Sequence, residues 1–276
     1  MRIERKFQEL SEKGRAALVT YITAGDPSLE LTPDIVFRLE KSGADIIELG
    51  VPFSDPMADG LAIQLASERA LNSGTTLHGV LDAVRKIRKH SEIPLLLFGY
   101  YNPFFAYGLK KLATDASEAG VDGILSVDLP PEEAEEFKIH TDDKGLNLVF
   151  LLAPNSTVER INLVAEYASG FVYLVSVTGV TGERPNLDYS LEPIIDEIRK
   201  HIRLPVGVGF GVSTPSQASK IAKLADAVIV GSALVRIIEK NGDNKVSLLS
   251  KIGEFVSGLS KACDKKGVNR RNRKVI

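Results

Sequence analysis

Hydrophobic and polar positions along this chain follow two alternating patterns. Short runs rich in aliphatic and β-branched residues, typical of buried strands, are followed by longer stretches in which apolar residues recur every three or four positions, as in amphipathic helices. Eight of the short runs predict strands, at residues 17–23, 45–50, 94–100, 121–126, 147–152, 172–177, 205–210 and 227–230. The longer stretches predict helices at residues 32–42, 76–90, 109–119, 132–144, 157–168, 189–201 and 215–224, with a further apolar helix at 246–260.

The regular alternation of strand and helix predicts a parallel sheet. Parallel strands need helical crossovers, and runs that are apolar at nearly every position indicate burial on both faces. Eight such units in about 250 residues have the size of an eight-stranded β/α barrel, a TIM barrel. A doubly wound open sheet is the competing architecture. We expect the barrel, with residues 1–264 as a single catalytic domain and the helix at 246–260 packed outside the ring.

Composition narrows the class of protein. A quarter of the 276 residues are charged and 44% are hydrophobic, which is ordinary for a globular chain. No run of about 18 apolar residues is present, and the amino end is already charged at Arg2, Glu4 and Arg5, so we expect a cytoplasmic protein without a signal peptide or a membrane partner. The single cysteine, Cys263, cannot form an internal disulfide, and redox chemistry is not expected.

The carboxyl end is strongly basic. Residues 261–276 have a net charge of +6, which leaves −8 for the rest of a chain whose formal net charge is −2. Such a tail could touch nucleic acid, but a solvated end is the simpler interpretation. We therefore expect residues 265–276 to form a disordered tail without function, and we expect no nucleic-acid partner.

Two glycine-rich loops follow the last two predicted strands, at residues 207–215 and 231–234, and each leads into a helix. Glycines let backbone N–H groups approach an anion closely, and a helix start adds unpaired donors. One such loop could be only a tight turn, but two on neighbouring final strands indicate the phosphate pocket of a β/α barrel. A dinucleotide fingerprint is disfavoured, because its third glycine is missing and the motif is not on a first strand.

Charged residues are rare in the predicted strands, and only Glu48 lies near a carboxyl end; Asp45 and Asp122 stand at strand beginnings, the structural end of a barrel. The two-residue period puts Ile46 and Glu48 on one face of an otherwise apolar strand. A carboxyl group in such a place acquires a raised pKa or a dedicated partner, and either makes it a candidate general acid or base. An ion pair with a core arginine is the alternative.

A second carboxylate, Asp59, follows in the loop after this strand. Two carboxylates in different surroundings can divide acid and base duties. Asp59 could instead cap the helix expected near Leu61, a role that is compatible with catalysis.

Other catalytic apparatus is missing from the sequence. The four histidines lie in or beside predicted helices without metal-ligand spacing, so no metal site is expected. No lysine lies on a predicted strand, which disfavours a Schiff base, and no Gly-x-Ser-x-Gly segment offers a serine nucleophile. Acid–base catalysis by carboxylates remains.

The segment at residues 47–60, IELGVPFSDPMADG, closely resembles the signature of the tryptophan synthase alpha subunit family. The resemblance implies a lyase of tryptophan biosynthesis that cleaves indole-3-glycerol phosphate to indole and glyceraldehyde 3-phosphate in a retro-aldol reaction. It continues in family order through YITAGDP at 21–27, YYNP at 100–103, VDLP at 127–130, YLVS at 173–176, GVTG at 179–182, GFG at 209–211 and GSA at 231–233.

The resemblance also implies a role for each matched residue. Glu48 would shuttle the proton between the indole carbon and the glycerol hydroxyl, Asp59 would bind the indole N–H and stabilise its developing positive charge, and Tyr173 would lie against the catalytic region. The indole slot would consist of Tyr21, Phe98 and Tyr100, and the phosphate would be held by Gly182, Gly211, Gly231 and Ser232 under a mobile lid at residues 179–188 that bears Thr181.

The same resemblance implies a partner, a beta subunit with pyridoxal phosphate, to which indole passes through a tunnel in an α2β2 heterotetramer. No cofactor is expected on this chain itself. The residues that match the family's partner loops are Pro52, Asp55, Asn102, Pro103, Phe104, Asp128 and Pro130.

One departure from the family pattern is Leu61, where proline usually follows Asp59-Gly60. Leucine frees the backbone that proline would fix, so the loop of Asp59 is expected to be less pre-organised. Two alternatives therefore stay open: a stand-alone indole-3-glycerol phosphate lyase that needs no partner, and a catalytically silent barrel that only activates one.

Overall fold

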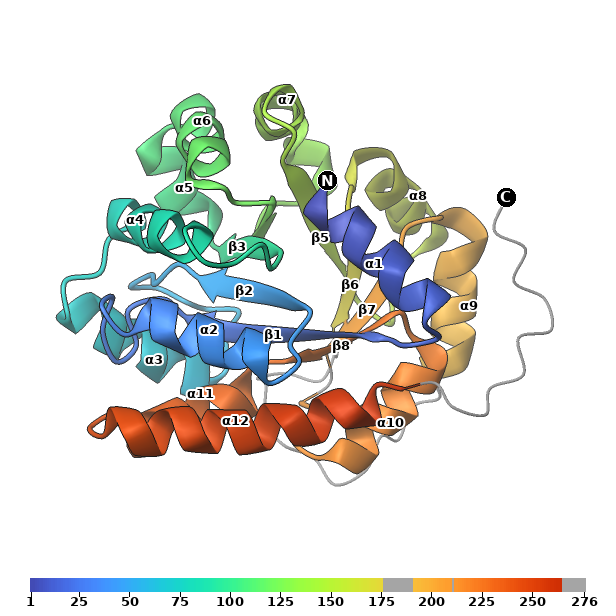
Figure 1. The fold of residues 1–276 in the computed structure, drawn as a ribbon. Coiled ribbons are helices and arrows are strands. Elements are labelled where there is room, and N and C mark those ends of the chain that lie inside the picture. The colour runs from blue at the N-terminus through green and yellow to red at the C-terminus, as the bar shows by residue number, and fades with distance from the viewer. Residues whose placement is uncertain (176–190, 210, 265–276) are drawn as a thin grey trace.

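The computed structural model describes residues 1–175, 191–209 and 211–264, and within them eight parallel strands form a closed barrel (Figure 1). Each strand pairs with its neighbours in sequence, and the last pairs with the first. The closed ring confirms the barrel and rules out the open sheet. The strands are β1 (Ala17–Thr23), β2 (Ile46–Gly50), β3 (Leu95–Gly99), β4 (Gly123–Ser126), β5 (Asn147–Leu152), β6 (Val172–Val175), β7 (Val206–Gly209) and β8 (Ala227–Val230).

Helices surround this ring, and α12 (Lys245–Ala262) packs outside it against α2, α10 and α11, as the sequence predicts (Figure 1). The helix predicted at 132–144 is divided into a short 3-10 turn, η1 (Pro131–Glu133), and α7 (Glu135–Asp143). The remaining predicted helices are α2 (Thr32–Lys41), α4 (Leu77–Arg88), α6 (Leu109–Ala119), α8 (Val158–Tyr167), α9 (Leu191–His201) and α10 (Pro215–Leu224), and helices also follow the loops at α3 (Leu61–Asn72) and α11 (Ser232–Asn241).

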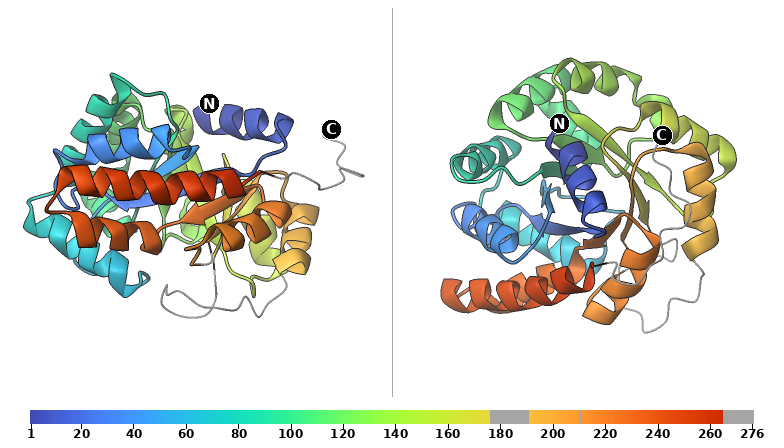
Figure 2. Two further views of the ribbon diagram at one scale, coloured as in Figure 1. Left: turned by 60° about the horizontal axis from the view of Figure 1, so that its bottom comes forward. Right: turned by 45° about the vertical axis from the view of Figure 1, so that its right-hand side comes forward.

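Two helices were not predicted, α1 (Arg2–Glu12) and α5 (Tyr101–Tyr107). The apolar side chains of α1 join a cluster of alternate strand residues inside the barrel, and Phe7 contacts Phe171 with ring centroids 5.7 Å apart. Because Phe171 directly precedes β6, α1 covers the amino end of the barrel interior, where it crosses the ring in the right-hand view of Figure 2.

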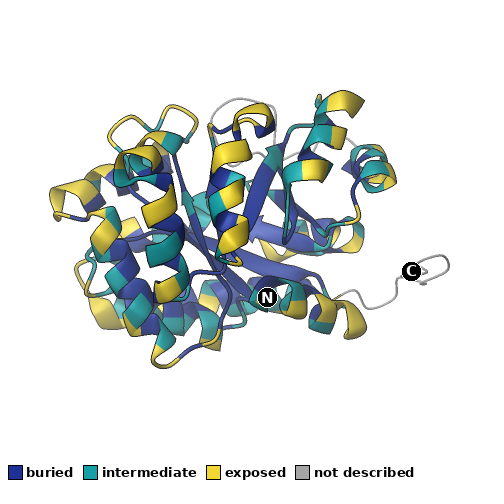
Figure 3. Ribbon diagram, turned by 90° about the horizontal axis from the view of Figure 1, so that it is seen from above, coloured by how far each residue is buried: buried dark blue, intermediate teal, exposed yellow. Residues whose placement is uncertain are grey.

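Side chains alternate along each strand between this interior cluster and a larger layer between strands and helices. Ile46 belongs to the interior cluster, whereas Ile47 and Leu49 belong to the outer layer. The strands are therefore almost wholly buried, and exposed residues lie on the outer faces of the helices and in the loops (Figure 3). Burial on both faces explains why the strands read as continuous apolar runs.

Aspartates at the amino ends of the strands tie neighbouring strands together. Asp45 and Asp122, which directly precede β2 and β4, accept backbone N–H bonds from Leu18 and Leu95, each at 2.8 Å. This confirms the structural role expected for both aspartates. Asp226, before β8, does the same for Val206 at 3.1 Å, and the three carboxylates pair respectively with Arg15, with Arg2 and Arg88, and with Arg199.

Candidate active site

Glu48 lies on β2 with its side chain inside the barrel, at the expected two-residue spacing from Ile46. It is 1% exposed, and neither carboxylate oxygen has a hydrogen-bond partner among the described residues. The alternative of a permanent ion pair with a core arginine therefore finds no support. Burial raises the pKa of the Glu48 carboxyl to about 8, because desolvation penalises its charged form. At neutral pH this group holds a proton.

Asp59 lies in the loop between β2 and α3. Its Oδ2 accepts a hydrogen bond of 3.0 Å from the hydroxyl of Tyr100, and the same phenol oxygen accepts the backbone N–H of Ala58 at 2.9 Å. Burial raises the pKa of Asp59 to about 6, and the Tyr100 hydrogen bond opposes that rise. Asp59 is therefore largely ionised at pH 7, whereas Glu48 is not, so the two carboxyl groups hold opposite protonation states.

Asp59 is not a helix cap. Gly60 occupies the N-cap position of α3, and no side chain caps this helix. Leu61 is the first helical residue and is 64% exposed. The loop is nevertheless held in place, because the Asp59 N–H bonds the Pro56 carbonyl at 3.0 Å and the Gln64 side chain bonds the Asp59 carbonyl at 2.7 Å. These bonds restrain the backbone that a proline at position 61 would otherwise help to fix.

Aromatic residues lie around the two carboxyl groups. Tyr21 is adjacent to Glu48 in the register of β1 and β2, and its ring meets that of Phe98 edge-on at 5.1 Å. Burial raises the pKa of Tyr173 well above its ordinary value, and the neighbouring Glu48 and Asp59 carboxylates raise it further. The phenols thus stay neutral and form an apolar lining suited to a flat aromatic ring. Of the predicted residues, the structure brings together Glu48, Asp59, Tyr21, Phe98, Tyr100 and Tyr173.

The loops after β7 and β8 lie next to this group. Gly211 has a left-handed φ of +63°, a conformation that favours glycine. Gly231 occupies the N-cap position of α11, where a Cβ would lie 3.5 Å from the Cβ of Tyr21, and Ser232 is the first helical residue. Free N–H groups at this helix start can face an anion beside the aromatic lining. Two expected phosphate and lid residues, Thr181 and Gly182, lie outside the described residues.

The predicted partner loops have mixed exposure. Asp55, Asn102, Asp128 and Pro130 are exposed, Pro103 is partly exposed, and Pro52 is buried. Phe104 is completely buried and packs against Phe137, so its side chain cannot contact another chain, and its assignment to the interface is corrected. Phe105, which is 60% exposed, presents the aromatic surface of α5 instead.

Sequence reasoning missed two contacts near the site. It placed Tyr100 in the indole slot but gave no sign that its hydroxyl bonds Asp59, because the two residues are 41 positions apart. It also missed the buried Asp26, whose carboxylate accepts two hydrogen bonds from Arg69 of α3, at 2.9 and 2.8 Å. This ion pair links the loop after β1 to the helix that follows Asp59.

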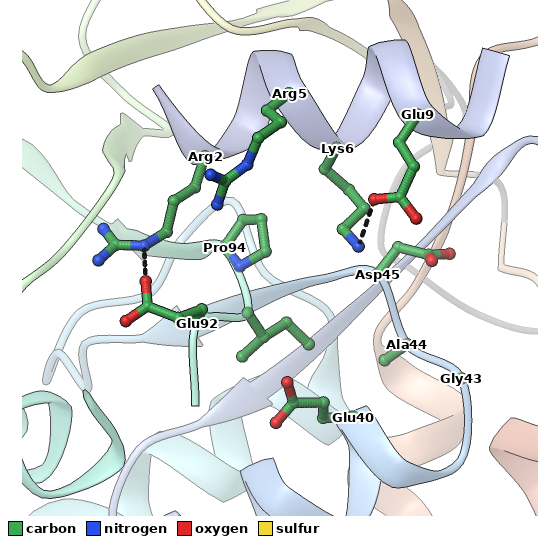
Figure 4. Close-up of a pocket in the computed structure, with 11 residues that line it drawn as sticks. Arg2, Arg5, Lys6, Glu9, Glu40, Gly43, Ala44, Asp45, Glu92 and Pro94 are labelled. Atoms are coloured by element: carbon green, nitrogen blue, oxygen red, sulfur yellow. Dashed lines mark hydrogen bonds and ion pairs between the residues drawn. The ribbon is translucent and has the colours of Figure 1, made fainter. Parts of the chain in front are cut away.

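A cavity of about 510 Å³ lies at the opposite end of the barrel, between α1 and the starts of β2 and β3 (Figure 4). Its lining carries charges of both signs, several of which neutralise each other: Arg2 bonds Glu92 at 2.6 Å and Lys6 bonds Glu9 at 3.3 Å. Neither Glu48 nor Asp59 lines it. This cavity is therefore separate from the group of residues around Glu48 and Asp59.

The described part of the chain holds neither a cluster of metal ligands nor a membrane-spanning helix. No three His, Cys, Asp or Glu side chains gather there as ligands for a metal ion. No helix in residues 1–175, 191–209 or 211–264 is long and apolar enough to cross a membrane.

Comparison with known proteins gives a consistent result. The tryptophan synthase alpha chain family model matches residues 7–264. The tryptophan synthase alpha chain of Geotalea uraniireducens is 55% identical over 259 residues, which cover 94% of this chain and 96% of that one; its counterpart from Geobacter sulfurreducens is 54% identical over 261 residues, with coverages of 95% and 98%.

Solved structures agree with the sequence relatives. The alpha subunit of tryptophan synthase from Legionella pneumophila superposes with a TM-score of 0.88 at 40% identity, covering 95% of this chain and 98% of that one. Tryptophan synthase from Mycobacterium tuberculosis gives a TM-score of 0.87 at 35% identity with the same coverages. On this evidence the chain belongs to the tryptophan synthase alpha chain family.

Proposed function

We propose that Glu48 and Asp59 carry out the alpha reaction of tryptophan synthase, the cleavage of indole-3-glycerol phosphate to indole and glyceraldehyde 3-phosphate. The observation that supports this most strongly is the buried, unpartnered carboxyl of Glu48, whose pKa of about 8 lies above that of Asp59 at about 6. Between these two values one group is an acid and the other an anion, which is the division of duties that the reaction needs.

Glu48 acts first as an acid. Its proton passes to the indole carbon that bears the glycerol chain, which turns the ring into a cation able to accept the electrons of the breaking carbon–carbon bond. The Glu48 carboxylate then takes the proton of the adjacent glycerol hydroxyl, the carbon–carbon bond breaks, and an aldehyde and indole are formed. This second transfer restores protonated Glu48, so that the cycle closes without a proton from solvent.

Asp59 stabilises the cation between these two steps. Its carboxylate accepts the indole N–H, whose acidity rises when the ring becomes positive, and a charge-assisted hydrogen bond strengthens at that moment. Because this contact is stronger in the transition state than with the neutral ring, it lowers the barrier rather than only binding substrate. The Tyr100 hydroxyl donates a hydrogen bond to Oδ2 of Asp59, and this bond keeps the carboxylate ionised and oriented.

Substrate binding uses the groups around the two carboxyls. Tyr21, Phe98 and Tyr100 hold the indole ring, and Tyr173 lies against the catalytic region. The phosphate is held by backbone N–H groups at Gly211 and Gly231, by Ser232 and by Gly182, under a lid that bears Thr181. Support comes from the left-handed Gly211 and from the start of α11 beside Tyr21.

Membership of the family implies a beta subunit as partner. We place the chain in an α2β2 heterotetramer in the cytoplasm, with pyridoxal phosphate on the beta subunit and indole passing directly to it. The exposed residues Asp55, Asn102, Asp128 and Pro130 form the contact surface, and their position in the segments that follow β2, β3 and β4 at the carboxyl end of the barrel supports this arrangement.

The test is indole release from indole-3-glycerol phosphate, measured with and without a beta subunit. We expect turnover that the beta subunit increases, abolished by Glu48→Gln and strongly reduced by Asp59→Asn. A rate that the beta subunit does not change would instead identify a stand-alone lyase. No turnover by the intact chain under either condition would identify a silent barrel.

A further inference from the structure

Asp128, at the exposed end of β4, makes two hydrogen bonds that the reaction does not explain. Its Oδ1 accepts the backbone N–H of Tyr101 at 2.7 Å and the hydroxyl of Ser126 at 3.0 Å. The first bond reaches the segment that follows the preceding strand, β3, where Tyr101 begins α5. The second fixes the Asp128 side chain to its own strand, because Ser126 is buried at the end of β4.

The bond to Tyr101 is one of two that hold the backbone on either side of Tyr100. On the other side, the Val127 N–H bonds the Gly99 carbonyl at 2.9 Å. Tyr100 is the N-cap residue of α5 but offers no capping side chain, so Asp128 supplies the acceptor that a local cap would provide. Val127 and Asp128 thus form hydrogen bonds with the backbone immediately before and after Tyr100.

The side chain of Tyr100 connects this part of the backbone to Asp59. Its ring lies 5.3 Å from that of Phe53, and its oxygen bonds both Ala58 N–H and Asp59 Oδ2. We infer that Asp128 is a positioning residue that holds the Tyr100 phenol against the Asp59 carboxylate, and that it links the partner-facing loop after β4 to this carboxylate. This inference rests on the role of Asp59 proposed above.

Such a link gives a beta subunit a route to the reaction. Asp128 is exposed, so a contact there can turn its carboxylate toward or away from Tyr101 without disturbing the barrel. A shift of the Tyr101 N–H moves the start of α5, and the phenol of Tyr100 moves with it. Asp59 is then better or worse oriented toward the indole N–H, while the phosphate loops after β7 and β8 are unaffected.

The experiment is a double-mutant cycle on the full-length chain without a beta subunit, so that no interface contact is lost. We expect Asp128→Ala to lower kcat about tenfold, as the loss of a hydrogen bond to a charged group allows, with KM changed less than twofold. Asp128→Asn, whose amide oxygen can accept the Tyr101 N–H, restores most of the rate. In a Tyr100→Phe background, Asp128→Ala lowers kcat less than twofold further.

Glu133→Ala is the matched control, since it removes an exposed acid from the same loop. The inference is overturned if the effects of Asp128→Ala and Tyr100→Phe multiply, or if Asp128→Asn is as slow as Asp128→Ala while both variants melt with the parent. Failure of the proposed function looks different: Asp59→Asn would then keep the parental rate whatever the cycle shows.

Discussion

Replacing Glu48 by glutamine should remove activity and at the same time stabilise the fold. Glutamine has the shape of a protonated glutamate but cannot ionise. The Glu48 carboxyl is 1% exposed and has no hydrogen-bond partner among the described residues, so its charged form is costly in the folded chain. Loss of a group that donates and accepts the proton should lower turnover by about 10²–10⁴-fold.

The size of the stabilisation depends on pH. Folding raises the pKa of this carboxyl from 4.5 to about 8. Below 4.5 both folded and unfolded chains are protonated and glutamine gives no advantage. As the pH rises further, the unfolded chain ionises first, and the folded state loses about 1.4 kcal/mol per pH unit until the folded pKa is reached. At pH 7 the glutamine variant should therefore be more stable by roughly 3 kcal/mol.

Thermal unfolding of both proteins across this pH range tests the reasoning. A gain of this size corresponds to a melting temperature about 6 °C higher at pH 7 in a chain of this length, and the difference should vanish near pH 4.5. Glu133→Gln, which removes an exposed charge, controls for the change in net charge. A melting difference that is the same at pH 4.5 and pH 8 would refute the buried, uncompensated carboxyl, and turnover within tenfold of the parent would refute its catalytic role.

Three further outcomes follow from the structure. The pH profile of kcat/KM should rise through about 6, as Asp59 ionises, and fall through about 8, as Glu48 loses its proton; a flat profile between pH 5 and 9 would contradict both assignments. Tyr100→Phe removes a hydrogen bond that lowers the pKa of Asp59, so the acid limb of that profile should move to higher pH, and an unmoved limb would contradict the contact. Asp122→Ala leaves Arg88 without its carboxylate and the Leu95 N–H without its acceptor, and should destabilise the fold by about 3–5 kcal/mol in chemical denaturation while kcat stays within twofold.

The strands could be predicted because burial on both faces restricts most of their positions to apolar residues. The strands at 17–23, 147–152 and 227–230 begin and end where their apolar runs do. Helix ends were less certain, since caps lie outside the periodic pattern: Thr76, predicted as helical, caps α4 by accepting the Gly79 N–H.

The two helices that were not predicted, α1 and α5, were missed for different reasons. In α1 the apolar residues Ile3, Phe7 and Leu10 recur at helical spacing and would predict a helix. The prediction considered only the charge of this segment. In α5 the local sequence carries no start signal. Asn102 and Pro103 are typical of a turn, and the acceptor for the first N–H is Asp128, which is remote in sequence and adjacent only in the closed barrel.

The residues of the site also differ in whether the local sequence reveals their surroundings. Glu48 could be singled out from one strand, because a carboxylate among aliphatic residues is visible without any partner. The environment of Asp59 could not, since Tyr100 comes from the next strand and its hydroxyl reaches the carboxylate only when β2 and β3 pair. Long-range hydrogen bonds of this kind leave no local pattern, so the contact that opposes the burial-induced rise of the Asp59 pKa could not be predicted.

Carboxylates at the two ends of this barrel have opposite surroundings. At the amino end, Asp45, Asp122 and Asp226 each accept a backbone N–H and pair with arginine, and these bonds join neighbouring strands. Inside the barrel toward the carboxyl end, neither oxygen of Glu48 has a hydrogen-bond partner among the described residues, so burial is not offset there and raises the pKa of this carboxyl to about 8.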